Sequence, residues 1–190
     1  MKIDKQKTLS QLLDQTETQL NTAIEWQLVS HSQFARRPEA NAWSANECLQ
    51  HLNSYGRYYL PQIEKAIVPQ ATVAREFSPG WLGNYFTNLM KPQPNGKASN
   101  MKAPKDHRPA AILESHLVLS TFIDQQEHLL KLLRRCADAD WEVRLPISLT
   151  QLIKLKLGDV LMFYTAHQQR HCLQAQRALQ GIAAKKKIES

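Results

Sequence analysis

Four long segments of the chain carry apolar residues at three- and four-residue intervals, the spacing that gathers side chains on one face of an α-helix. These segments are residues 4–31, 44–68, 109–137 and 157–180. None of them shows the strict alternation that is typical of a half-buried strand. A helix with one apolar face must bury that face against another element, so we expect an all-α fold in the form of a four-helix bundle.

The start of the second segment is the best-defined helix boundary in the sequence. Ser44 is a favoured N-cap residue, and Glu47 three residues later completes a capping box. We expect His31 to close the last turn of the first helix, where its imidazole interacts well with the helix dipole. Pro109 suits the first position of the third helix, and Gly181 is typical of a helix end.

Residues 69–109 differ in composition from the helical segments, because six of the nine prolines lie there. Within this stretch, residues 80–90 are rich in aromatic and aliphatic side chains and predict a short helix or a packed turn. Residues 91–108 form a connection longer than ordinary helix–helix loops, so we expect it either to cross the molecule or to line a functional opening.

A length of 190 residues fits one domain with a well-buried core. We expect this domain to span residues 1–184, followed by a basic tail at residues 185–190. No apolar run is long enough to cross a bilayer and the N-terminus lacks the apolar core of a signal peptide, so we expect a cytoplasmic protein without a membrane partner. Three cysteines without paired spacing argue against a disulfide framework.

The formal net charge of +7 raises the question of a nucleic-acid partner. The basic residues form no stripe interleaved with aromatic side chains, and no nucleic-acid-binding motif is present. A solvated surface and the basic tail account for the charge, so we expect no nucleic-acid partner.

His167 and His171 are the first candidates for a functional site. Two histidines four residues apart on a helix project from the same face and can converge on one ion. The HExxH zinc helix shares this spacing, but Gln168 stands where that motif has its catalytic glutamate. Two imidazoles do not hold a metal tightly, so the site needs a third ligand from elsewhere in the chain.

His51 is the candidate for that third ligand. At a rise of about 1.5 Å per residue it lies roughly 11 Å from the start of its helix, and the His167–His171 pair is centred roughly 17 Å from either end of its own helix. In antiparallel neighbours these levels agree within about one turn, so the spacing permits a shared metal. A lone buried histidine is also often a hydrogen-bonded core group, and this alternative stays open for His51.

The order of these motifs resembles one known family. The chain contains Trp43-Ser44-x-x-Glu47-x-x-x-His51-Leu52, then Leu157-Gly158-Asp159, then His167-x-x-x-His171, with a proline-broken loop from Lys91 to Lys105 between the second and third helices. In this respect it resembles the DinB/YfiT-like metalloenzymes over nearly its whole length. The resemblance implies an up-down-down-up four-helix bundle with a long crossover connection between helices 2 and 3.

The resemblance also implies a function. His51, His167 and His171 would bind one divalent metal ion, nickel or zinc, with open positions for a substrate. The reaction would be that of a thiol S-transferase or a hydrolase acting on a small molecule, with a low-molecular-weight thiol as a co-substrate of the transferase, and the protein would be a homodimer. The alternative is a non-catalytic bundle that is structural or regulatory, or that binds a metal without catalysis.

Further residues are candidates for supporting the site. Glu47 can accept a ring proton from His51, although the capping role competes for the same carboxylate. Tyr55 either lines the pocket or packs in the core. Arg170 either meets an anionic substrate or lies on the solvated surface.

The sequence also allows an expectation for three other histidines, namely whether each side chain is buried or exposed. We expect His116 to face inward, as a fourth ligand, a proton carrier or a core histidine. We expect His107 and His128 to be exposed.

Overall fold

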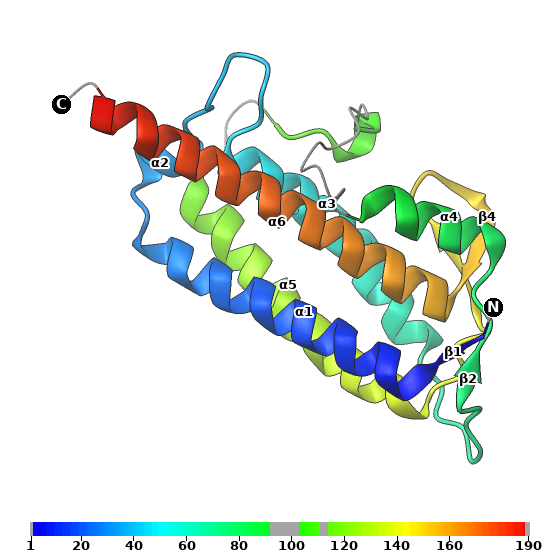
Figure 1. Ribbon diagram of the computed structural model, residues 1–190. Coiled ribbons are helices and arrows are strands. Elements are labelled where there is room, and N and C mark those ends of the chain that lie inside the picture. The colour runs from blue at the N-terminus through cyan, green and yellow to red at the C-terminus, as the bar shows by residue number, and fades with distance from the viewer. Residues whose placement is uncertain (1, 92–102, 111–113, 189–190) are drawn as a thin grey trace.

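A computed structural model of the protein describes residues 2–91, 103–110 and 114–188, with side chains up to residue 182, and its main body is a bundle of four long helices (Figure 1). The all-α four-helix bundle predicted from the sequence is therefore confirmed. The bundle helices are α1 (Lys5–Glu25), α3 (Ala45–Ala66), α5 (Ser115–Arg135) and α6 (Leu157–Ile188). No helix within these described ranges is long and apolar enough to cross a membrane.

Each bundle helix packs against two others: α1 and α3 each contact both α5 and α6. Two hydrogen bonds between α3 and α5 give the relative direction of these helices. Asn53 Nδ2 donates to the Val118 carbonyl oxygen, and Arg135 donates to Glu64 further along both helices. Because the residue numbers rise together, α3 and α5 run in the same direction, as Figure 1 also shows. Two parallel helices need a connection that returns along the bundle, which is why residues 67–114 form such a long one.

Shorter elements surround the bundle. The helical ones are η1 (Trp26–Leu28), α2 (His31–Ala35), α4 (Trp81–Met90), η2 (Lys105–His107) and η3 (Cys136–Asp138). Strand β1 (Ile3–Asp4) pairs antiparallel with β2 (Glu76–Phe77), and β3 (Arg144–Ile147) pairs antiparallel with β4 (Thr150–Lys156).

The predicted capping box is confirmed at the start of α3. The Glu47 amide donates to Ser44 Oγ at 3.2 Å, and the Ser44 amide donates to a Glu47 carboxylate oxygen at 2.9 Å. The short helix expected within residues 80–90 is also confirmed as α4.

Three helix boundaries differ from the sequence prediction. The first helix ends at Glu25, and His31 starts α2, where Ser30 is the N-cap, instead of closing α1. The third helix begins at Ser115, so the prediction of a start at Pro109 is wrong. The fourth helix continues through Gly181, because a glycine in a helix costs only about 1 kcal/mol relative to alanine and cannot by itself stop a long helix.

The hairpin of β3 and β4 was not expected from the sequence. Its strands are short, Pro146 lies in the first, and residues 151–154 of the second are all exposed, so no alternation of apolar and polar residues marks them. The basic tail expected at residues 185–190 remains a prediction; the structure describes a helix up to Ile188 but no side chains beyond residue 182.

Helix α4 lies along α6 and is fastened to it by one carboxylate. Asp159 is 1% exposed, and both of its carboxylate oxygens accept from the Gly80 amide at 3.1 Å. Gly83 faces the same side chain so closely that a Cβ there would lie 2.2 Å from Asp159 Cγ. At the other end of α4, the Arg170 guanidinium donates to the Leu89 carbonyl oxygen. The helix therefore covers α6 along the stretch that carries the histidine pair.

Candidate metal centre

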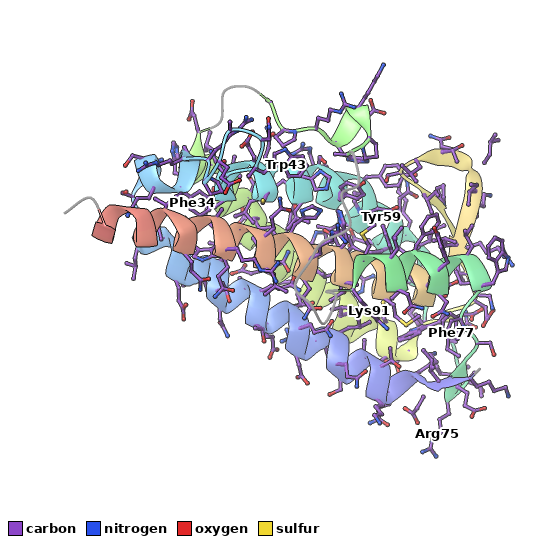
Figure 2. All side chains as sticks on the ribbon, turned by 45° about the horizontal axis from the view of Figure 1, so that its top comes forward. Phe34, Trp43, Tyr59, Arg75, Phe77 and Lys91 are labelled. Carbon is purple, nitrogen blue, oxygen red and sulfur yellow. The ribbon has the colours of Figure 1, made fainter. Side chains whose placement is uncertain are left out.

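The structure brings together the three histidines that the sequence singled out. His51 comes from α3, and His167 and His171 come from α6; one ring nitrogen of each lies within 4.8 Å of those of the other two. The closest pair is His51 Nε2 and His167 Nε2, which are 3.2 Å apart. In Figure 2, the labelled Trp43 and Tyr59 bracket the part of α3 that contributes to this cluster.

Hydrogen bonds set the tautomers of two of the rings. His51 Nδ1 lies 2.6 Å from the backbone carbonyl oxygen of His107. A carbonyl oxygen can only accept, so this nitrogen carries the proton and His51 Nε2 presents its lone pair to the cluster. His171 Nδ1 likewise faces the Gln174 amide oxygen at 2.9 Å, which leaves the lone pair on His171 Nε2. Two lone pairs directed at a common point are what a metal ligand set requires.

Burial keeps the three imidazoles neutral. Desolvation is the first cause of each shift: it lowers the pKa of His51 to about 4 and that of His171 to about 3, and it holds the pKa of His167 well below its usual value. The neighbouring imidazoles and the Arg170 guanidinium add to the effect on His167. A metal binds the neutral form of histidine, so the electrostatics of the pocket suit the donor set.

Aromatic rings hold the histidines in position. The Trp43 ring lies 5.1 Å from that of His51 and 5.9 Å from that of His171. Phe163 stacks on His167 with an interplanar angle of 12°. Tyr55 lies 4.4 Å from the His167 ring, measured between centroids. Tyr55 therefore lies beside the histidine cluster and also packs in the hydrophobic core, so both of its predicted roles stay open.

His107 also lies at this site, although no pattern in the sequence predicts its position there. The expectation that His107 is exposed is wrong: its side chain is 6% exposed, and its ring stacks on Tyr55 at 3.8 Å between centroids. It lies in a proline-rich connection 56 residues from His51, where no periodic pattern marks a buried position.

The hydroxyl of Ser54 fixes the tautomer of His107. Ser54 Oγ donates to the His51 carbonyl oxygen at 2.7 Å, and it lies 2.8 Å from His107 Nδ1. Because the hydroxyl proton is already used, Ser54 Oγ accepts from His107 Nδ1, and the lone pair of His107 is on Nε2. Burial lowers the pKa of His107, which keeps this nitrogen unprotonated.

Two of the other candidates do not join the cluster. Glu47 accepts from Arg37 and completes the capping box, so the group that orients the His51 ring is the His107 carbonyl instead. His116 is exposed and lies 3.8 Å from the Glu114 carboxylate, so the expectation that it faces inward is wrong. His116 lies between the buried residues Ser115 and Val118 in the first turn of α5, on the face that points to solvent.

Arg170 lies beside the histidine cluster without being one of the three converging imidazoles. Its side chain is half-buried, and its charge is close enough to lower the pKa of both His167 and His171. It is therefore beside the cluster, as the i+3 spacing from His167 allows, and it also holds the C-terminal end of α4 through Leu89.

Fold and site together define a class: a helical bundle in which buried imidazoles from two antiparallel helices converge on one point. Residues 12–175 match the model of the DinB superfamily, and the chain belongs to this superfamily. The resemblance found in the sequence is thereby confirmed.

One solved structure with the same fold is YfiT from Bacillus subtilis, described as a probable metal-dependent hydrolase with an unusual four-helix bundle topology. The two chains are 17% identical, with a TM-score of 0.54, and the match covers 94% of this chain and 87% of YfiT. No curated protein matches the sequence.

Proposed function

We propose that the protein is a mononuclear metal-dependent enzyme that acts on a small molecule, as a hydrolase or a thiol S-transferase. The observation that carries the proposal is the convergence of one nitrogen each from His51, His167 and His171 within 4.8 Å. Sites with three protein ligands and free coordination are of the catalytic kind, whereas structural zinc sites have four. The description of YfiT as a metal-dependent hydrolase supports the same class of function.

The residues fit a divalent ion. His51 and His171 present lone pairs on Nε2, and burial keeps both rings neutral. Imidazole ligands suit both nickel and zinc, so the ligand type does not choose between them. When bound, such an ion supplies Lewis-acid activation of water for hydrolysis or of a thiol for transfer.

His107 supplies the proton acceptor that the sequence lacked at position 168. Its Nε2 is unprotonated because Nδ1 donates to Ser54, and the ring centroid lies 6.5 Å from that of His51. We propose that His107 Nε2 takes the proton released by the activated water or thiol, while Tyr55 holds the ring in place by stacking. Trp43 and Phe163 exclude water from the far sides of the ligand rings.

The charge of Arg170 at the edge of the cluster supports an anionic group on the substrate. Glutathione carries carboxylates, and a guanidinium binds a carboxylate with two parallel hydrogen bonds. The expected homodimer stays a prediction, which sedimentation analysis of the purified chain tests.

The test begins with metal content. Protein purified without chelators should carry about one nickel or zinc ion per chain, the stoichiometry of a single catalytic-type site. The substitution His167→Ala should abolish binding and leave the helical circular dichroism intact, whereas His116→Ala, at an exposed position, should bind as the wild type does. Absence of metal binding in the wild type, or equal loss in both variants, would overturn the proposal.

A second measurement separates enzyme from non-catalytic metal protein. The metal-loaded chain should turn over model electrophiles with added thiols, or activated esters, and His107→Ala, measured at saturating metal, should lower kcat. Metal-loaded protein without turnover of either substrate class would favour the non-catalytic alternative.

A further inference from the structure

The core of the bundle is divided into two separate hydrophobic clusters. One includes Leu9, Leu12, Tyr59, Leu129 and Tyr164, and the other includes Ala23, Leu52, Phe122, Cys172 and Ala175. All four bundle helices contribute side chains to both clusters. Each helix therefore passes from one cluster to the other at some point along its length.

At that point each helix carries a buried amide side chain. On α1 it is Gln19, between Leu12 and Ala23, and on α5 it is Gln126, between Phe122 and Leu129. On α6 it is Gln168, and on α3 it is Asn53. The four side chains are 4%, 0%, 0% and 2% exposed in this order, and each lies in sequence between residues of the two clusters, so we refer to the four together as the polar layer.

Most of the hydrogen-bonding atoms in this polar layer find no protein partner. Both amide atoms of Gln19, Gln126 and Gln168 lack a hydrogen bond to any described residue, and so does Asn53 Oδ1. Buried polar groups are nearly always hydrogen-bonded, to protein or to ordered water. Several such atoms left unsatisfied at one level would consume much of the small net stability of a domain.

The amide groups of the polar layer determine what kind of molecule could bind there. Amides supply both donors and acceptors but no charge, so the site suits a small neutral molecule that donates and accepts. Tyr164, whose pKa burial raises, adds to the same interior a hydroxyl that also lacks a hydrogen bond to any described residue. Thr16 Oγ1 donates to the Leu12 carbonyl oxygen and retains acceptor capacity.

We propose that Gln19, Gln126 and Gln168 bind internal water molecules, which form a hydrated layer across the bundle between the two hydrophobic clusters. Buried waters typically make about three hydrogen bonds each, and amides from three helices can supply them. The layer lies at the level of the histidine cluster, because Gln168 stands between His167 and His171 on α6. Water bridges from Gln168 therefore tie this part of α6 to α1 and α5. The proposal does not depend on metal binding.

A crystal structure of the full chain at high resolution gives the direct test. Ordered water oxygens should lie within hydrogen-bonding distance of at least two of the three glutamines. Amides that bond directly to one another, with no water between them, would overturn the proposal.

Thermal unfolding gives an independent readout. In a hydrated layer, Gln126→Leu removes partners from bound water and from the other amides, so the Tm should fall by about 2–6 °C. The triple variant Gln19→Leu, Gln126→Leu, Gln168→Leu leaves no amide to hydrate at these positions and should recover at least part of that loss. The exposed Gln11→Leu on α1 should leave the Tm unchanged. A rise of the Tm in the single variant would show a dry, unsatisfied layer and contradict the proposal.

Discussion

The Nδ1 atom of His51 lies 2.6 Å from the backbone carbonyl oxygen of His107, so a residue from the long connection orients a histidine of the bundle. The contact fixes the tautomer of His51 and the direction of its Nε2 lone pair. Ser54 holds both partners, because its hydroxyl donates to the His51 carbonyl oxygen and accepts from the His107 ring. Substitution of the partners of metal-ligating histidines typically costs about 10–100-fold in metal affinity.

Removal of the Ser54 hydroxyl should therefore weaken metal binding. We expect Ser54→Ala to raise the Kd for nickel or zinc about tenfold, because the His107 ring loses its anchor and the His51 ring its orientation. Titration calorimetry with each metal measures the change.

Ser120 provides the matched control for this prediction. Its hydroxyl makes the same kind of bond, to the carbonyl oxygen three residues earlier, on the exposed side of α5. Ser120→Ala should leave the Kd unchanged. An identical Kd in Ser54→Ala and wild type would show that the Ser54–His107 contact does not act on the site.

The close approach at the start of α6 predicts a large effect of one methyl group. A Cβ on Gly158 would lie 2.6 Å from Phe77 Cε1 and 2.7 Å from Trp141 Cε3, and both rings are buried in the core. We expect Gly158→Ala to lower the free energy of unfolding by about 1–3 kcal/mol, the usual cost of overpacking. Urea denaturation followed by circular dichroism measures it.

The same substitution near the other end of α6 should have the opposite sign. A Cβ on Gly181 meets Pro38 at 3.8 Å, an ordinary contact, so Gly181→Ala should stabilise the helix by up to about 1 kcal/mol. Equal effects of the two substitutions would mean that crowding at Gly158 is relieved without cost.

The carboxylate of Asp159 predicts a pH dependence of stability. Burial raises its pKa above the ordinary value of 3.8, although the Gly80 amide and Lys156 act in the opposite direction. A carboxyl group with a raised pKa in the folded state is favoured when protonated, so its contribution to stability is present at low pH and is lost as the pH rises through the folded pKa.

The substitution Asp159→Asn removes this titration while it keeps an acceptor for Gly80. The difference in Tm between the variant and the wild type should become more positive as the pH rises from about 3.5 to 7. A difference that is constant, or that falls with pH, would contradict the raised pKa. Glu142→Gln, an exposed change that also removes a carboxylate near Lys156, serves as the control.

The features that could be predicted from the sequence are those set by residues close together in the chain. Apolar residues at helical spacing marked the four bundle helices, and Ser44 with Glu47 marked the start of α3 to the residue. The four-residue spacing of His167 and His171 placed both on one helix face. These features depend only on the helical repeat and on neighbours within one turn.

Contacts between residues far apart in the sequence could not be predicted, because they depend on how the helices and their connections pack. His51 and His167 are 116 residues apart, and only the antiparallel packing of α3 on α6 brings their Nε2 atoms to 3.2 Å. The partner of the His51 ring could not be found from its own helix, where Glu47 was the nearest acceptor, because it is a backbone oxygen in a distant connection. Such an oxygen is present at every residue and leaves no trace in the sequence.

The sequence by itself thus determined which segments are helical, which faces are apolar and which histidines share a face, because the backbone repeat sets all three. The tertiary structure alone decided that His107 is buried and His116 exposed, that α4 covers α6, and that each bundle helix carries a buried amide side chain. The physical reason is that burial is a property of packing between segments: a polar side chain is drawn inside or left in water by the elements that happen to surround it.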